Sequence, residues 1–180
     1  MNDPAMTDTQ RPCGWGILST GRIARSFATN LTAVPGARLS AVASRTRSSA
    51  DAFAAEYGGS DCRAYASYDD LVGDPDVDVV YVASPHALHL EHARLALEAG
   101  KPVLVEKPLT LTAGDSEELV SLARERGLFL MEAMWMACHP LVRALREGLA
   151  VGRWGTPRQL HADLGFVVEA PAGDRLVDPA

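Results

Sequence analysis

The sequence predicts an α/β fold in which helices cover both faces of a doubly wound, parallel sheet. Three observations support this prediction. Short apolar runs that suit buried strands alternate with helical patterns of roughly 10 to 15 residues. Gly and Pro residues separate most of these runs. Strands that are joined through helices form right-handed βαβ crossovers, and such strands are parallel.

Strands and helices follow one another regularly over the first 150 residues. The continuous apolar run at Val77–Ala83 suits a strand in the middle of a parallel sheet. Thr112 precedes a helical pattern with acidic residues in its first turns, as expected for a capped helix start. Strands are expected at Trp15–Leu18, Ala37–Ala43, Cys62–Tyr65, Val77–Ala83, Pro102–Val105 and Leu128–Met131, and a strand exposed on one face at Arg158–Phe166. Helices are expected at Arg22–Thr32, Ser48–Tyr57, Tyr68–Leu71, Leu88–Glu98, Thr112–Arg126 and Pro140–Leu149.

The composition is that of a soluble globular protein and argues against a nucleic-acid-binding protein. Of the 180 residues, 47% are hydrophobic and 22% are charged, and the formal net charge is −6. No apolar run approaches the roughly 20 residues of a transmembrane helix. Met1–Pro12 resemble a disordered polar tail rather than a signal peptide. Cys13, Cys62 and Cys138 are widely spaced, which predicts reduced thiols in the cytoplasm rather than disulfides or a metal site.

The turn between the first strand and the first helix predicts a nucleotide site. Ser19–Ala24 (STGRIA) fills the dinucleotide pattern Gly-x-Gly-x-x-Gly/Ala, with Ser19 in place of the first glycine. Gly21 lets the backbone approach a pyrophosphate, which the helix N-terminus also attracts. The alternative is an ordinary strand-to-helix turn. The candidate cofactor contacts in this turn are Ser19, Thr20, Gly21, Arg22 and Ile23.

The residues after the second strand favour NADP over NAD. Ligands of doubly wound sheets lie at the carboxyl ends of the strands, and NAD is usually held there by an acidic residue. This chain has Ser44, Arg45 and Arg47 instead. A guanidinium pairs with a phosphate through two parallel hydrogen bonds. The alternative is that both arginines face water at the start of a surface helix.

Histidines follow the fourth strand. Ser84 and Pro85 end this strand, and His86, His89 and His92 then repeat every three residues. On a helix they spread over about 120°, and no Cys or Asp cluster completes a ligand set, so we expect no metal. We expect Ser84 and Pro85 to pass close to the cofactor and His86 or His89 to touch it. A histidine that only starts the helix is the alternative.

The strongest single signal is Glu106-Lys107-Pro108, at the end of the fifth strand. Beside a nicotinamide, the Lys107 ammonium can bond the substrate oxygen and stabilise its negative charge while hydride leaves the carbon. Glu106 would lower the cost of that charge. A Lys–Glu pair at the surface is the alternative. Further on, Trp135 either walls a substrate pocket or belongs to the core.

With these residues in view, the chain resembles the glucose–fructose oxidoreductase/inositol dehydrogenase (Gfo/Idh/MocA) family. The most similar branch contains dimeric dihydrodiol dehydrogenase and NADP-dependent D-xylose dehydrogenase. The segments that carry the resemblance are Trp15–Ala24, Ala43–Arg45, Tyr65–Leu71, Leu97–Pro108 and Phe129–Trp135.

The resemblance implies a Rossmann NAD(P)-binding domain at residues 13–150 and only the start of an α+β, open-sheet substrate domain at 151–180. It implies that Lys107 is catalytic and that a His or Tyr of the second domain donates a proton. That residue would lie beyond residue 180, so we expect a truncated chain, and a homodimer for a full-length form. Relatives often carry Arg where this chain has Ala137. Trp135 and His139 are the candidate substrate contacts.

The predicted function is NADP-dependent hydride transfer between nicotinamide and a hydroxyl or carbonyl carbon of a sugar, polyol or trans-dihydrodiol. The alternative from another class is a non-catalytic NADP-binding module, or a subunit that another polypeptide completes. A Rossmann-like domain without a ligand is a third possibility.

Overall fold

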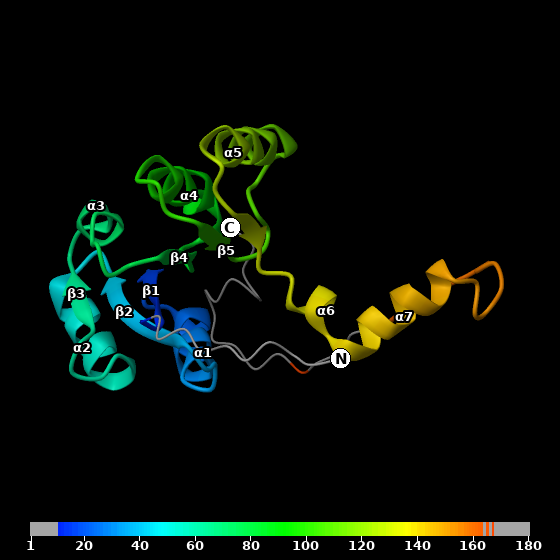
Figure 1. Cartoon of the computed structure of the whole chain (residues 1–180), viewed down its shortest axis with the longest axis horizontal. Helices are drawn as coiled ribbons and strands as arrows, with labels where there is room; N and C mark the ends of the chain where they lie inside the picture. Colours follow the sequence, from blue (N-terminus) through cyan, green and yellow to red (C-terminus); the bar gives the residue numbers. More distant parts are fainter. Residues whose placement is uncertain (1–10, 164, 166, 168–180) are drawn as a thin grey trace, which may run out of the picture. The chain divides into compact units, whose positions relative to one another are not determined.

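A computed structural model describes residues 11–163, 165 and 167 of the chain. Six parallel strands form one sheet in the order β3-β2-β1-β4-β5-β6. The chain starts in the middle of the sheet at β1 and winds outward on both sides, which is the doubly wound order of a Rossmann fold (Figure 1). The predicted fold class is confirmed. The strands are β1 (Cys13–Leu18), β2 (Ala37–Ala43), β3 (Arg63–Tyr65), β4 (Val79–Val82), β5 (Val103–Val105) and β6 (Leu130–Glu132).

The helices begin and end close to the predicted positions, because local residues cap them. The hydroxyl oxygens of Thr46, Ser67 and Thr112 each accept a hydrogen bond from the main-chain N–H three residues further on. Gly127, in the left-handed conformation, ends the longest helix. The helices are α1 (Arg22–Leu31), α2 (Arg47–Tyr57), α3 (Tyr68–Val72), the 3₁₀ turn η1 (His86–Leu88), α4 (His89–Glu98), α5 (Ala113–Arg126), α6 (Trp135–Cys138) and α7 (Pro140–Ala150).

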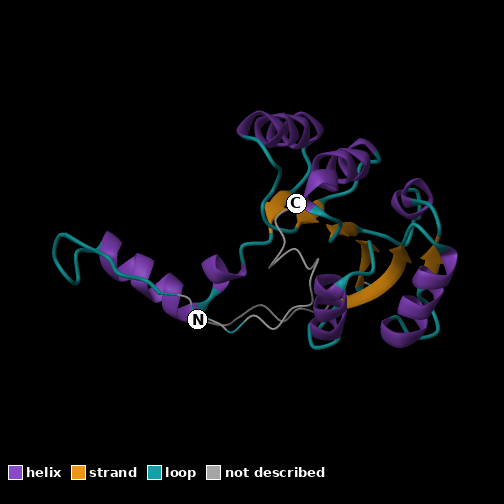
Figure 2. Ribbon diagram, turned by 180° about the vertical axis from the view of Figure 1, so that it is seen from behind, coloured by secondary structure: helices purple, strands orange, loops and turns teal. Residues whose placement is uncertain are grey.

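Two hydrophobic cores lie on opposite faces of the sheet, because successive strand residues point to opposite sides. In β1, Ile17 belongs to one core and Leu18 to the other, and both side chains are fully buried. Helices α1 and α2 cover the face of Ile17, and helices α3, α4 and α5 cover the face of Leu18 (Figures 1 and 2). This two-sided burial explains why the strands read as continuous apolar runs.

The expected strand at Arg158–Phe166 is wrong for the residues that the structure describes. Residues 158–163 and 165 form neither strand nor helix, and they are exposed. A strand needs a neighbour to accept its main-chain hydrogen bonds, and the described residues form no strand outside the six-stranded sheet. Residues 164 and 166 lie outside the described part of the chain. The short helix α6 was not predicted.

The chain divides into two compact units, residues 1–134 and residues 135–180. We expected the cofactor domain to extend to residue 150, but α7 belongs to the second unit. The expected tail falls mostly on residues 1–10, which lie outside the described residues. Arg11 donates two hydrogen bonds to the Asp78 carboxylate, at 3.0 and 2.6 Å. No helix among the described residues is both long enough and apolar enough to span a bilayer.

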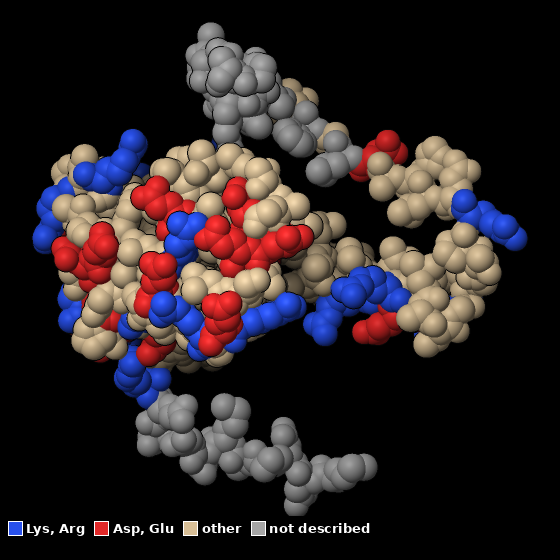
Figure 3. All heavy atoms as spheres, turned by 90° about the horizontal axis from the view of Figure 1, so that it is seen from above, with Lys and Arg blue, Asp and Glu red and all other residues tan. Residues whose placement is uncertain are grey.

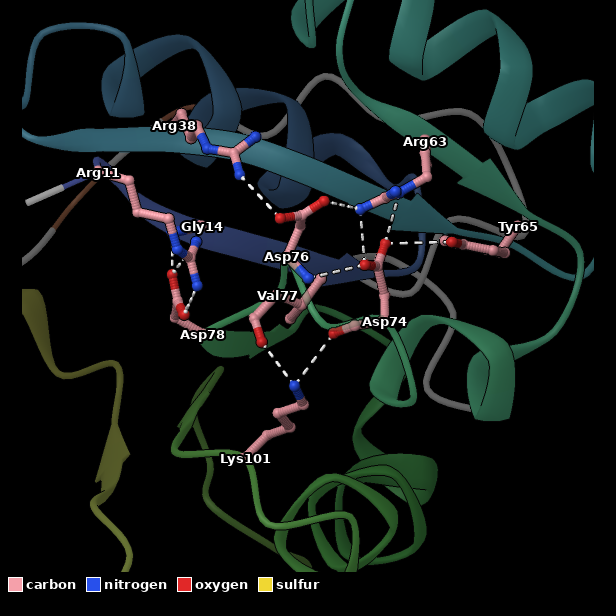
Figure 4. A network of polar contacts seen from close by, with 10 residues as sticks. All are labelled: Arg11, Gly14, Arg38, Arg63, Tyr65, Asp74, Asp76, Val77, Asp78 and Lys101. Carbon is pink, nitrogen blue, oxygen red and sulfur yellow. Dashed lines mark hydrogen bonds and ion pairs between the residues drawn. The ribbon is translucent and has the colours of Figure 1, made fainter.

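A network of charged side chains ties together the edge of the sheet at which β1 and β4 begin (Figure 4). At its centre, the Asp74 side chain is 1% exposed and accepts two hydrogen bonds from Arg63, at 2.8 and 2.7 Å. Lys101 donates to the main-chain carbonyls of Asp74 and Val77, at 3.0 and 2.7 Å. This edge lies opposite the carboxyl ends of the strands. The predicted site residues of the first unit are found at those carboxyl ends.

Candidate functional site

The turn after β1 presents an uncapped helix start. Ser19 has a φ of 85°, a conformation that favours glycine, which explains why the dinucleotide pattern has a glycine there. Its N–H donates to the Ala43 carbonyl at 2.8 Å. Gly21 is the N-cap of α1, and no side chain caps this helix. The first N–H groups of α1, which include those of Arg22 and Ile23, are therefore left for a ligand or for water.

The turn after β2 carries two arginines that look equivalent in the sequence but differ in their contacts in the structure. Arg47 donates to Asp51 within α2 at 2.8 Å, as an i,i+4 ion pair. Arg45 is exposed, and it makes no ion pair with any described residue. Ser44 is buried, and its hydroxyl lies 3.4 Å from that of Thr20, so the turns after β1 and β2 touch.

The turn after β4 holds one buried hydroxyl without a partner. Ser84 is 6% exposed, and its Oγ has no hydrogen-bond partner among the described residues. Pro85 is exposed and precedes η1, which begins at the half-buried His86.

His89 is one of the two histidines of which we expected one to touch the cofactor, and that contact stays a prediction. It is fully buried at the start of α4. Its Nδ1 lies 2.7 Å from the Pro108 carbonyl oxygen and its Nε2 lies 3.0 Å from the Ser84 carbonyl oxygen. Both ring nitrogens of His89 therefore lie at hydrogen-bond distance from main-chain carbonyls of the turn after β4 and the segment after β5.

The segment after β5 is fixed by its neighbours and leaves Lys107 exposed. The Lys107–Pro108 peptide bond is cis. The Glu106 carboxylate accepts the Tyr81 hydroxyl at 2.6 Å and the Lys107 main-chain N–H at 3.2 Å. Burial and the bond to Glu106 raise the pKa of Tyr81. Among the described residues no ion pair joins Lys107, so the alternative of a surface Lys–Glu pair is not formed.

Two residues of this framework were missed in the sequence. Glu132, at the end of β6, accepts the Leu109 N–H at 2.9 Å and thereby fixes the chain just after Pro108. Tyr81 stacks on Phe27, with ring centroids 3.9 Å apart, while its hydroxyl holds Glu106. A polar aromatic residue within the valine-rich strand β4 was the available signal for Tyr81.

The candidate substrate residues lie in the second unit. Trp135 begins α6 and is 79% exposed. His139 is the N-cap of α7, and its Nδ1 accepts the Leu141 N–H at 3.3 Å. Their role toward a substrate stays a prediction.

Other features of the first unit do not compete with this site. Of two hollows in this unit, one of about 370 Å³ lies near the start of β2, and one of about 590 Å³ lies beside β3 and is lined in part by Arg47. Among the described residues, no three His, Cys, Asp or Glu side chains lie close enough to hold a metal ion. On the face shown in Figure 3, acidic and basic side chains of this unit are interspersed.

Comparisons with known proteins agree with this geometry. Residues 13–134 match the model of an oxidoreductase family with an NAD-binding Rossmann fold, GFO_IDH_MocA. The D-xylose 1-dehydrogenase (NADP⁺) of Hypocrea jecorina is 42% identical over 172 residues, which are 90% of this chain and 44% of that protein. The trans-1,2-dihydrobenzene-1,2-diol dehydrogenase of Mus musculus is 42% identical over 154 residues, with 84% and 46% covered. The chain thus spans less than half the length of these two relatives.

Solved structures give the same result. A 3-ketoreductase from Actinomadura kijaniata, in complex with TDP-benzene and NADP, superposes with a TM-score of 0.72 at 38% identity, covering 81% of this chain and 45% of that one. The scyllo-inositol dehydrogenase of Lactobacillus casei gives a TM-score of 0.74 at 28% identity, covering 82% and 44%. The family model matches most of the chain, and the similar structures are oxidoreductases of the same type. This chain belongs to the Gfo/Idh/MocA family of oxidoreductases.

Proposed function

We propose that this chain binds NADP and serves an oxidoreductase that acts on a hydroxyl or carbonyl carbon of a sugar, polyol or trans-dihydrodiol. The substrate classes come from the D-xylose and dihydrodiol dehydrogenases that resemble it. The observation that carries the proposal is that an uncapped α1 N-terminus and an exposed Lys107 follow the parallel strands β1 and β5, whose carboxyl ends lie at the same edge of the sheet. The direction in which the chain adds strands reverses between β1 and β4. In doubly wound sheets, ligands usually bind in the crevice at this point, outside the carboxyl ends of the strands.

The residues at this edge fit a dinucleotide. A methyl group added at Gly21 would have no atom of the described residues within 4 Å apart from its chain neighbours, so the backbone is open to a pyrophosphate from that side. The free N–H groups of α1 and the positive end of its dipole suit that charge. The buried Ser84 hydroxyl offers a further hydrogen bond at the end of β4.

Arg45 is the residue that we assign to the 2′-phosphate of NADP. It is exposed and makes no ion pair with the described residues, whereas Arg47 is held by Asp51. No carboxylate stands at residues 43–47 to receive the ribose hydroxyls of NAD. The hydroxyl of Ser44 lies beside that of Thr20 and can complete the adenosine end of the site.

Lys107 is assigned the catalytic contact with substrate. Bound NADP supplies a nicotinamide ring that accepts or returns a hydride. The Lys107 ammonium donates a hydrogen bond to the substrate oxygen and stabilises the negative charge that develops on it. The segment that carries Lys107 is held on both sides, by Glu106 through Tyr81 and by Glu132 through Leu109. This support limits the motion of the backbone from which Lys107 projects.

Calorimetry with the purified chain tests the cofactor assignment. We expect NADPH to bind more tightly than NADH, and Arg45→Ala to weaken NADPH binding about tenfold or more while leaving NADH binding unchanged. Arg47→Ala is the matched control, because this guanidinium already has a partner, and it should change NADPH binding less than about threefold. Equal affinities for the two cofactors, or equal effects of the two substitutions, would refute the role of Arg45.

Gly21→Ala tests the phosphate site separately from folding. Apart from its chain neighbours, the added methyl has no described atom within 4 Å, and Gly21 has an ordinary φ of −69°, so stability should change by less than about 0.5 kcal/mol. The methyl would occupy the space of the pyrophosphate, so we expect NADPH binding to be lost. Full NADPH affinity in this variant would contradict the proposed position of the phosphates.

A non-catalytic NADP-binding module remains the second candidate, because the chain spans less than half of its dehydrogenase relatives. NADP reduction in the presence of D-xylose or a trans-dihydrodiol decides between the two. Turnover that disappears in Lys107→Ala supports the enzyme, whereas NADPH binding without turnover supports a module or a subunit that another polypeptide completes. A homodimer and a cytoplasmic location stay predictions; light scattering and cell fractionation test them.

A further inference from the structure

The ring of His89 joins two loops that carry predicted cofactor residues. Both of its nitrogens lie at hydrogen-bond distance from carbonyl oxygens, 2.7 Å for Pro108 and 3.0 Å for Ser84. A carbonyl oxygen can only accept a hydrogen bond, so each contact needs a hydrogen on the imidazole nitrogen. Two such contacts require both nitrogens to carry hydrogen, which is the imidazolium form.

The position of the ring explains what these bonds accomplish. Strands β4 and β5 are paired up to Val82 and Val105, and the Glu106 N–H then donates to the Val82 carbonyl at 2.9 Å. His89 continues this connection past the ends of the strands, from Ser84 to Pro108. One of the linked residues, Ser84, carries the unpartnered buried hydroxyl, and the other, Pro108, directly follows Lys107.

Other roles for His89 fit the structure less well. Its side chain is fully buried, so it does not face solvent as a ligand contact or proton shuttle would. No group of three metal-binding side chains includes it among the described residues. The ring of His86 packs edge-on against it, with centroids 5.4 Å apart.

We propose that His89 is a positioning residue that donates from both ring nitrogens and so sets the spacing between the Ser84 turn and the Lys107–Pro108 segment. This inference rests on the proposed NADP site. Burial and the positive end of α4 oppose a cation at this position. The two carbonyl oxygens offset that cost by accepting hydrogen bonds from the imidazolium. If a ring nitrogen lacked its hydrogen, its lone pair would face the carbonyl oxygen at short range.

Replacing His89 by Phe keeps an aromatic ring and removes both donors. The matched control is His92→Phe, on the same helix. His92 is 3% exposed and packs edge-on against Tyr68, and its Nδ1 has no partner among the described residues. We expect His89→Phe to raise the dissociation constant of NADPH about tenfold, and His92→Phe to change it less than twofold. Circular dichroism confirms that each variant is folded during the titration.

His89→Gln restores part of the link, because its amide nitrogen can donate to one of the carbonyls. Its NADPH affinity should lie between those of the wild type and His89→Phe. A residue that served only to fill space would not show this order. Equal affinity in the wild type and His89→Phe would overturn the positioning role.

Nitrogen-15 NMR of histidine-labelled wild-type chain tests the double donation without any cofactor. At pH 7 we expect His89 to show two ring N–H protons and the nitrogen shifts of an imidazolium, assigned by their disappearance in His89→Gln. A neutral tautomer would refute donation from both nitrogens. Failure of the wild type to bind NADPH would refute the proposed cofactor site, and with it the positioning role, while the NMR result would still decide the hydrogen bonds.

Discussion

Replacing Asp74 by Ala should remove the centre of the charged network shown in Figure 4. Its carboxylate is 1% exposed and accepts four hydrogen bonds: two from Arg63, one from the Tyr65 hydroxyl at 3.1 Å and one from the Asp76 N–H at 2.9 Å. The substitution takes away every one of these acceptors at once.

The expected loss follows from the exposure of each partner. The bonds from Tyr65 and Asp76 end on a charged, buried oxygen and are worth about 1.5 kcal/mol each. The Arg63 side chain is 46% exposed, so water replaces much of its interaction with the carboxylate, and the pair adds only about 1 kcal/mol. We therefore expect Asp74→Ala to lower the free energy of unfolding by about 4 kcal/mol, within the range for breaking a buried ion pair.

Urea denaturation followed by circular dichroism measures this loss. Asp61→Ala is the control, because Asp61 is exposed and accepts only the Ser60 hydroxyl among its described hydrogen bonds. It should change stability by less than about 0.5 kcal/mol. Asp74→Asn, which keeps one acceptor oxygen, should fall between the two. A loss below about 1 kcal/mol in Asp74→Ala would refute the reasoning from burial.

Three further predictions concern single positions. Gly14→Ala places a methyl group 2.0 Å from the Asp76 carbonyl oxygen, so it should lower stability by about 3 kcal/mol in urea denaturation; an unchanged midpoint would contradict this. Burial raises the pKa of Cys62 to about 11, so at pH 8 iodoacetamide should modify the exposed Cys138 well before Cys62, as mass spectrometry would show; equal rates would argue against it. Burial lowers the pKa of His92 below 6.5, so in acid the unfolded chain binds more protons than the folded chain. The free energy of unfolding should therefore fall as the pH drops below about 6.5. Urea denaturation at several pH values measures this fall, which His92→Phe should reduce.

The sequence predicted the fold well because the fold depends on local patterns. The run at Val79–Val82 is apolar on both sides since helices cover both faces of the sheet, and Thr112 caps α5 as its position suggests. The predicted site residues of the first unit follow β1, β2, β4 and β5, whose carboxyl ends lie at one edge of the sheet because all of these strands are parallel.

The arrangement of side chains within the site could not be predicted in the same way. Nothing in the spacing of His86 and His89 shows that one is half-buried and the other enclosed between two carbonyls, because those partners lie on loops 5 and 19 residues away. For the adjacent Glu106 and Lys107, a surface ion pair was the alternative left open by the sequence, but the carboxylate accepts a hydrogen bond from Tyr81, 25 residues earlier in the chain. Contacts across strands decide these orientations.

The strand order has a consequence for how the chain folds during synthesis. Of the described strands, β1 is made first, and it lies between β2 and β4 in the finished sheet. Once residues 13–65 have left the ribosome, β1, β2 and β3 can pair, but the other edge of β1 stays open until Val79–Val82 emerge. That edge carries unpaired main-chain N–H and C=O groups beside apolar side chains in the nascent chain, so it can associate with other chains during this interval. Chaperone binding to stalled nascent chains should therefore be strongest before β4 is exposed, and it should decline once β4 closes the centre of the sheet.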